Sequence, residues 1–246
     1  MNDDTFMEAA RVVLHAYRSP GFCPDQFVGD ILVGSDNITP PRSSGHRSDF
    51  AERQGVPPWT RSDDPVVILV LESPHTDEYV DTIGPAKGKT GQNIRTFLDE
   101  ACNLRHCLQD GLYPLILVNA IQYQCSLGCP TKFFRDRVFA EVWAQGGKSD
   151  FQSRINAVYR EGDLIVNACT AGKRKTPNWK LVKDALEEMS LVHAKVEHPA
   201  NWERRRNTAL KNGYRPDYGW KYPNGANGSV AQKGHSADAE NGVANS

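Results

Sequence analysis

The sequence predicts an α/β protein with three layers, an α/β/α sandwich around a central four-stranded, mostly parallel sheet. Four short apolar runs, three of them rich in valine and isoleucine, are typical of buried strands. Helical patterns separate these runs, which favours parallel crossover connections. The predicted strands are residues 66–71, 115–118, 164–166 and 191–196, and the last alternates most, as expected of an edge strand.

The predicted helices follow from apolar residues at spacings of three and four. The first covers residues 5–18, where Thr5 and Glu8 have the spacing of a capping box. Others cover residues 92–103, 178–189 and 203–211, and further helical patterns extend to about residue 159.

The chain divides into three parts by composition. Residues 1–65 comprise the first helix and an irregular arm rich in Pro, Gly, Ser and charge, and we expect them to pack on the core. Within the arm, residues 27–33 fit either a short strand or a helix. Residues 66–223 form the α/β domain. Residues 224–246 lack apolar periodicity and predict a disordered tail.

Composition predicts a soluble globular protein without a membrane partner. The chain has 246 residues, 39% of them apolar, and no apolar run approaches the roughly 20 residues that span a bilayer. Its start is acidic and lacks the layout of a secretory signal, so we expect a cytoplasmic protein. The net charge of -1 means that any binding of nucleic acid depends on a local basic patch.

The six cysteines do not form C-x-x-C pairs. Zinc and iron–sulfur sites usually have tighter spacing, so buried thiols are the favoured interpretation and no metal or other cofactor is expected. Cys125 and Cys129 are the candidates for the alternative, a metal site.

Three polar residues lie just at or past the ends of predicted strands. Glu72 follows the first strand within Leu71-Glu72-Ser73-Pro74-His75, Asn119 ends the second, and His198 follows the fourth within His198-Pro199. The carboxyl ends of parallel strands face a shared crevice, where open α/β sheets bind ligands. Taken singly, each residue has an ordinary structural interpretation, such as a turn cap.

The order of these motifs resembles the uracil-DNA glycosylase superfamily over about residues 66–205. The first motif looks like that of the iron–sulfur-type branch, with Glu72 on its glutamate and Pro74 on its proline, whereas Leu71 and His75 replace glycines. Asn119 matches the asparagine that reads the pyrimidine edge. His198 matches the histidine of a histidine-proline pair. The iron–sulfur branch holds its cluster with four cysteines. This chain does not show their pattern, so the resemblance implies no cluster here.

The resemblance implies a monofunctional DNA glycosylase that flips out and excises a modified base, with DNA as its partner. Glu72 would stabilise the sugar cation and orient water, His198 would donate to the departing base, and Asn119 would read it. The expected base pocket comprises Ser73, His75, Asn119 and Asn167. The expected DNA contacts are Lys87, Gly88, Lys89, Thr90, Gly91, Trp202, Arg204 and Arg205. A pyrimidine suits Asn119, and the glucosylated hydroxymethylcytosine that anti-phage members of the superfamily excise is one candidate.

Two alternatives belong to other classes. One is a catalytically inactive nucleic-acid-binding module of the same fold. The other is a nucleotide hydrolase that uses the loop from Gly84 to Gly91, which looks like a P-loop. That loop has three residues rather than four before its Gly-Lys pair, and twelve residues separate it from the preceding strand.

Overall fold

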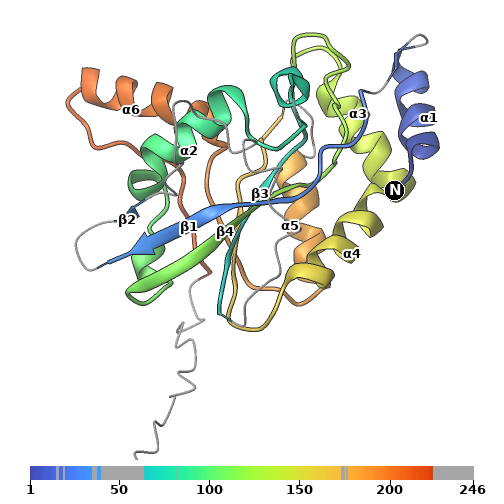
Figure 1. Ribbon diagram of the computed structural model, residues 1–246. Coiled ribbons are helices and arrows are strands. Elements are labelled where there is room, and N and C mark those ends of the chain that lie inside the picture. The colour runs from blue at the N-terminus through green and yellow to red at the C-terminus, as the bar shows by residue number, and fades with distance from the viewer. Residues whose placement is uncertain are drawn as a thin grey trace, which may run out of the picture.

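The chain folds as an α/β protein with a mixed, mostly parallel sheet flanked by helices (Figure 1). The computed structural model describes residues 1–14, 17–18, 20–34, 38–39, 64–81, 83–172, 175 and 177–223. The predicted disordered tail and residues 40–63 of the predicted irregular arm lie outside the described residues.

The sheet has six strands in the order β2-β1-β4-β3-β5-β6. Strands β4, β3, β5 and β6 run parallel to one another, and β6 lies at an edge, as the apolar runs predicted. The predicted number of strands is too low, because two antiparallel strands extend the sheet beyond β4. The bounds are β1 Gln26–Val33, β2 Ile38–Thr39, β3 Val67–Leu71, β4 Gly111–Asn119, β5 Leu164–Asn167 and β6 His193–Lys195.

Strand β1 decides between the two interpretations of residues 27–33. These residues form a strand, which confirms the first of the two alternatives. The pairing of β1 with β4 shifts between Phe27 and Gly29, and Gly29 has a φ of 123°. Such a bulge interrupts the two-residue periodicity by which a strand is recognised.

The observed helices match the predicted ones in their order along the chain, but several begin or end at other residues. Helix α1 begins after Asn2, whose side chain accepts a hydrogen bond from the Thr5 backbone, so the predicted capping box of Thr5 and Glu8 is wrong. It also ends at Val13 rather than at residue 18. The bounds are α1 Asp3–Val13, α2 Gly88–Ala101, α3 Arg135–Val142, α4 Lys148–Val158, α5 Asn178–Glu188 and α6 Trp202–Lys211.

Short helical turns lie between these elements. Three are 3-10 helices: η2 (Thr76–Tyr79), η3 (Leu104–His106) and η5 (Pro199–Asn201). A π-helical turn, η4 (Trp143–Gly147), joins α3 to α4. Both η2 and η5 follow strands at the carboxyl end of the sheet and therefore shape the region above it.

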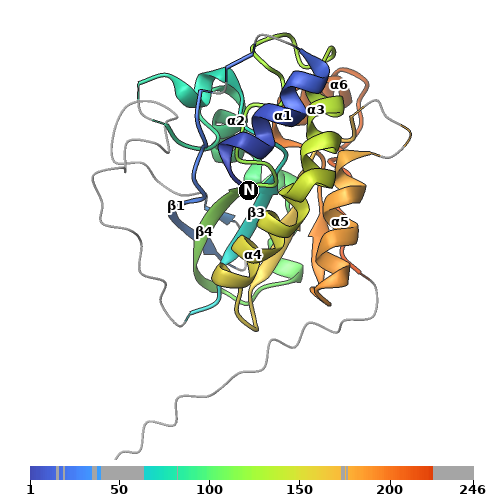
Figure 2. The ribbon, with the colours of Figure 1, turned by 90° about the vertical axis from the view of Figure 1, so that its right-hand side faces the viewer.

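Helices cover both faces of the sheet (Figures 1 and 2). Val67, Leu69 and Leu71 of β3 pack with α2 and with Trp202 of α6. Ile68 and Val70 point to the other face, where α1, α3, α4 and α5 lie. A strand buried on both faces reads as a continuous apolar run, which is why β3 is easily recognised in the sequence.

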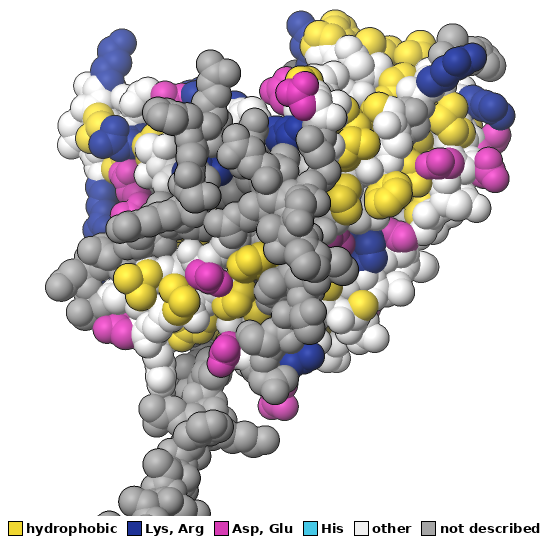
Figure 3. All heavy atoms as spheres, viewed as in Figure 1, with side chains coloured by type: hydrophobic (Ala, Val, Ile, Leu, Met, Phe, Trp, Pro, Cys, Tyr) yellow, Lys and Arg dark blue, Asp and Glu magenta, His cyan; other side chains and the backbone are white. Residues whose placement is uncertain are grey.

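The surface carries charges of both signs. On the face seen in Figure 3, the described lysines and arginines are interspersed with aspartates and glutamates. Among the described helices, none has both the length and the hydropathy that crossing a membrane requires.

Candidate active site

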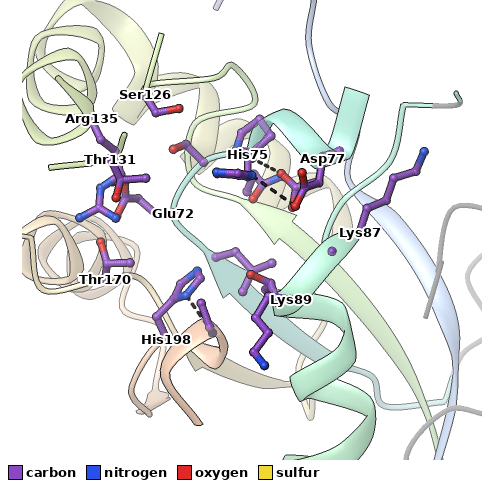
Figure 4. A pocket seen from close by; sticks show the side chains of 18 of the residues that line it. Glu72, His75, Asp77, Lys87, Lys89, Ser126, Thr131, Arg135, Thr170 and His198 are labelled. Atoms are coloured by element: carbon purple, nitrogen blue, oxygen red, sulfur yellow. Dashed lines mark hydrogen bonds and ion pairs between the residues drawn. The ribbon is translucent and has the colours of Figure 1, made fainter. Parts of the chain in front are cut away.

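A cavity of about 350 Å³ lies at the carboxyl ends of the parallel strands. Strand β3 is central here: the chain passes from it to β4 on one side and later to β5 on the other. Ligands of open α/β sheets bind at such a reversal of strand order. The cavity has the size of a small-molecule site, for which about 300 Å³ is a lower bound. Glu72, Asn119 and His198 all line it, together with Ser73 and His75 (Figure 4).

Glu72 presents a buried carboxylate to this cavity. Its side chain is 2% exposed, and Arg135 Nε lies 3.0 Å from its Oε1. Neither oxygen accepts a hydrogen bond of ordinary geometry from a described residue. Burial raises the pKa of Glu72 to about 7, and the nearby Asp136 adds to this, whereas the guanidinium of Arg135 opposes it. The carboxyl group therefore titrates near neutrality.

Asn119 presents an amide from the neighbouring strand. It pairs with Leu71 in the register of β3 and β4, so both side chains face the α2 layer. Its Nδ2 lies 3.7 Å from Cys23 Sγ, and its buried Oδ1 has no hydrogen-bond partner among the described residues. Buried polar atoms are normally paired, so an unpartnered oxygen that faces a cavity is suited to bind a ligand.

The end of β4 is held from behind by Arg154. Its Nη2 donates to the carbonyl oxygens of Asn119 and Ala120, each at 3.1 Å. Its Nη1 and Nε donate to Asp25 and Asp150, which fix the guanidinium. The backbone that carries the Asn119 amide is therefore rigidly placed.

His198 faces the same cavity from the turn after β6. Its Nδ1 accepts a hydrogen bond from the Ala200 backbone at 3.3 Å, which leaves the proton of the neutral ring on Nε2. Burial lowers the pKa of His198 to about 3, and the positive charge of Arg135 adds to this. The ring is thus a neutral hydrogen-bond donor.

Helix α2 fixes the position of this turn. Asn93 is 3% exposed, and its Nδ2 donates to the carbonyl oxygen of Pro199 at 2.7 Å. The contact joins the residue after His198 to the first turns of α2. Sequence reasoning missed Asn93, because an asparagine inside a helical pattern gives no signal of a distant partner.

Arg135 is the second residue that the sequence analysis missed. It begins α3 and lines the cavity, and both Nε and Nη2 also lie close to Asp136 Oδ1, at 3.1 and 3.0 Å. Its place depends on the course of residues 120–134, which no periodic pattern describes.

Glu78 is the third. It is 5% exposed, and its carboxylate accepts hydrogen bonds from the backbones of His75 and Ala86. Burial raises the pKa of Glu78 to about 8. The side chain therefore ties the two ends of the loop between β3 and α2 together, beneath the exposed His75.

Asn167, which was predicted to belong to a base pocket, does not line this cavity. It pairs with Val70 rather than with Leu71, so its side chain points to the α5 face. There its Nδ2 donates to the Trp179 carbonyl and its Oδ1 accepts from the Cys169 backbone. Both polar atoms are used within the fold.

Three of the predicted DNA contacts are largely buried. Trp202 is fully buried in the core, and its Nε1 donates to the Glu197 carbonyl at 2.7 Å. Gly91 is buried and does not line the cavity. Lys87 lines the cavity but is only 7% exposed, and its ammonium donates to the Val80 carbonyl, away from Glu72 and His198 (Figure 4).

The other predicted basic contacts are accessible but mostly paired. Lys89 forms an ion pair with Glu203, and Arg205 forms one with Glu197. Arg204 is exposed and donates weakly to Asn201 Oδ1 at 3.4 Å. Lys89, Gly88 and Thr90 line the cavity at the start of α2.

The start of α2 carries a feature that works against a bound phosphate. Gly88 has a φ of 30°, and a Cβ there would collide with the carboxylate of Asp77. The negative charge of Asp77 therefore already lies at the positive end of the helix dipole. His75 Nδ1 is 3.5 Å from the same carboxylate.

The cavity therefore combines a carboxylate that titrates near neutrality, a neutral imidazole donor and an unpartnered amide oxygen. This set can bind a polar planar ring and stabilise charges that develop on both sides of a breaking bond. Within the described ranges, no three His, Cys, Asp or Glu side chains are grouped as metal ligands.

Comparison of the chain with family models, with curated proteins and with solved structures finds no match.

Proposed function

We propose that the protein is a monofunctional DNA glycosylase that excises a modified pyrimidine and leaves an abasic site. The observation that carries the proposal is the meeting of Glu72, Asn119 and His198 in one cavity, with the buried Glu72 carboxylate paired with Arg135 and with Asn119 Oδ1 lacking a hydrogen-bond partner among the described residues. The similarity of the motif order to the uracil-DNA glycosylase superfamily, and the four parallel strands at whose ends the motifs lie, support the same assignment.

The base would enter the cavity after it leaves the DNA stack. Flipping costs a few kcal/mol, and hydrogen bonds to the exposed base edge offset part of that cost. Asn119 Oδ1 would accept from an N–H group on that edge, which uracil offers at N3 and cytosine at its 4-amino group. Arg154 keeps this oxygen in place through the backbone of β4.

Cleavage of the glycosidic bond leaves positive charge on the sugar and negative charge on the base. In its ionised form, Glu72 would stabilise the sugar cation and accept a proton from the attacking water. His198 would donate from Nε2 to the departing base without changing its own protonation state. Preorganised groups of this kind supply a large part of enzymatic rate enhancement.

The glucosylated hydroxymethylcytosine of phage DNA is the first substrate to test. The replacement of two motif glycines by Leu71 and His75 distinguishes the loop from that of plain uracil enzymes. The proposal is tested by mass spectrometry of bases released from DNA that contains this nucleotide, uracil or only ordinary bases. We expect one modified base to be released, together with alkali-labile sites in the DNA.

Two variants test the assigned roles. Glu72→Gln and Asn119→Ala should each reduce base release by at least about a hundredfold, as expected for a removed transition-state contact. Asn167→Ala is the matched control, because it removes a strand-end amide that faces away from the cavity. Thermal unfolding of all three variants separates loss of function from loss of fold. Release of wild-type amounts of base by both site variants would contradict the proposal.

The two other hypotheses give different outcomes in the same experiments. An inactive nucleic-acid-binding module would bind DNA in a salt-sensitive manner and release no base. A nucleotide hydrolase would release phosphate with magnesium, and Lys89→Ala would abolish this. The carboxylate of Asp77 beside Gly88 disfavours the hydrolase.

A further inference from the structure

A second cavity of about 290 Å³ adjoins the first. His198 and Asn201 line both cavities, so the two cavities meet at these residues. The second cavity lies towards β6 and is also lined by Trp179, Lys195 and Arg205. It is therefore placed to receive whatever is attached to a nucleotide in the first cavity.

Arg205, Glu197 and Asp217 of this second cavity already make contacts within the fold. Arg205 donates to both oxygens of Glu197, with 3.0 Å between Nη2 and Oε1. The Asp217 carboxylate accepts from the Gly219 backbone at 2.7 Å and fixes a turn. Neither group needs a ligand to complete its contacts.

Lys195 differs from these groups. Its Nζ lies 3.6 Å from the centre of the Trp179 ring, and it forms no ion pair with a described carboxylate. The ring face attracts the ammonium, while the charge of Glu197 acts on it from beyond ion-pair distance. Trp179 thus holds this cation at the wall of the cavity.

Lys221 adds a second positive charge next to Lys195. The two residues exchange backbone hydrogen bonds of 2.7 and 2.8 Å, so they are directly opposite each other. Like charges at such positions repel. Burial and this repulsion lower the pKa of Lys195, while the carboxylate of Glu197 raises it. A bound anion would relieve the repulsion.

We propose that the second cavity binds the phosphodiester next to the extruded nucleotide, through the ammonium of Lys195. This inference rests on the proposed function, because a nucleotide in the first cavity is covalently joined to its flanking phosphates. Lysine binds phosphate as a point charge and needs no fixed fork of donors. The subsite fixes the DNA strand beside His198 and so sets the register of the extruded nucleotide.

The test uses a DNA probe that can be designed without knowing which base is excised. The probe is an oligonucleotide with one tetrahydrofuran abasic analogue, in which a neutral methylphosphonate replaces one flanking phosphate at a time. Dissociation constants are measured for the wild type, Lys195→Gln and Lys221→Gln. Lys221→Gln is the matched control, because it removes the same charge from the adjacent residue, which does not line the cavity.

We expect wild-type affinity to fall roughly tenfold at one methylphosphonate position, as for the loss of one charged contact. Lys195→Gln should bind the all-phosphate probe roughly tenfold more weakly and be insensitive at that one position. Lys221→Gln should keep the wild-type sensitivity. Equal sensitivity of the wild type and Lys195→Gln at every position would overturn the phosphate subsite.

A separate outcome concerns the proposed function itself. A wild-type protein that binds the abasic probe no better than unmodified DNA would contradict the glycosylase proposal. Preference for the abasic probe, combined with no effect of Lys195→Gln, would overturn the subsite alone. Circular dichroism of the two lysine variants shows whether each keeps the fold.

Discussion

The guanidinium of Arg135 lowers the pKa values of two residues of the candidate site. It favours the ionised form of Glu72, from which its Nε is 3.0 Å away, and it disfavours the protonated form of His198. Both effects favour the states that the proposed reaction uses. One cation at the start of α3 therefore serves the carboxylate and the imidazole together.

The pH dependence of base release tests this arrangement. The rate should rise with pH until about pH 7, where Glu72 becomes ionised, and then level off. Arg135→Gln should move the rise to higher pH, because it removes the charge that favours the carboxylate. Asp136→Asn should move it to lower pH, because the charge it removes raises the pKa of Glu72. Single-turnover rates from pH 5 to 9 provide the measurement.

Opposite shifts are the diagnostic result. Damage to the fold would lower the rate of either variant at every pH without moving the midpoint. Midpoints that stay at the wild-type value in both variants would show that Arg135 and Asp136 do not act through Glu72.

The positions of polar residues at strand ends allowed part of the candidate site to be predicted from the sequence. Glu72, Asn119 and His198 could be placed near one another because parallel strands end at one edge. Asn167 could not be separated from Asn119, because a shift of one residue in register decides the face to which a side chain points. Trp202 resembled a surface aromatic because the residues after it are arginines, yet the helix turns its ring into the core.

Helix α2 is the element that organises the site. It closes the cavity with Lys89 and Thr90, and through Asn93 it holds the carbonyl of Pro199. Because η5 is only three residues long, this single hydrogen bond has a large share in fixing the turn that carries His198. The helix and the turn should therefore behave as one unit.

Loss of the Asn93 contact should slow the reaction without removing its groups. Asn93→Ala leaves the Pro199 carbonyl buried and unpartnered, a change that costs about 1–3 kcal/mol. We expect base release to fall about tenfold, because His198 loses its fixed position. Thr96→Ala on the same helix is the control, since Thr96 is exposed and bonds only within the helix.

Single-turnover kinetics of the two variants are the measurement. A rate for Asn93→Ala equal to that of Thr96→Ala would mean that the turn keeps its place without α2.

Helices and strands were predicted well where their apolar residues recur regularly, and poorly where that pattern is interrupted. The parallel strands were recognised from apolar runs, whereas β1 remained ambiguous because a bulge at Phe27–Gly29 breaks its alternation. Helix α2 starts four residues before its predicted start, at Gly88, because its polar first turn shows no apolar stripe. Its glycine is explained by a φ of 30° and by the nearby carboxylate of Asp77, neither of which the helical pattern indicates.

The stability of the whole molecule should depend on pH through two buried carboxyl groups. The pKa values of Glu72 and Glu78 rise to about 7 and about 8 in the folded protein. An unfolded glutamate titrates near 4.3, so the folded state binds more protons between these values. Stability contributed by these groups is present below about pH 4.5 and is lost as the pH rises to about 8.

Glu72→Gln should therefore stabilise the protein at high pH. At pH 8 we expect its free energy of unfolding to exceed that of the wild type by about 1–3 kcal/mol, since one pKa unit corresponds to about 1.4 kcal/mol. At pH 4 the difference should vanish, because Glu72 is then protonated in both folded and unfolded states. Urea unfolding at the two pH values is the measurement, and a variant that is less stable at pH 8 would contradict it.

The order of the apolar runs predicted the parallel part of the sheet. It did not predict the antiparallel strands β1 and β2. The order of the strands places β3 between β4 and β5, which no local pattern indicates. This central position, rather than any single motif, creates the cavity at the carboxyl ends of the strands.

The neutral ring of His198 also offers a spectroscopic marker. Its Nδ1 is hydrogen-bonded to the Ala200 backbone, and its pKa lies at about 3, so its imidazole resonances should stay constant while an ordinary histidine shifts with acidification. The chain has seven histidines, and the loss of one non-titrating signal from a His198→Asn variant would identify this one in nitrogen-15 spectra. Perturbation of that signal by an added oligonucleotide would then report occupancy beside it, even in a variant that performs no chemistry.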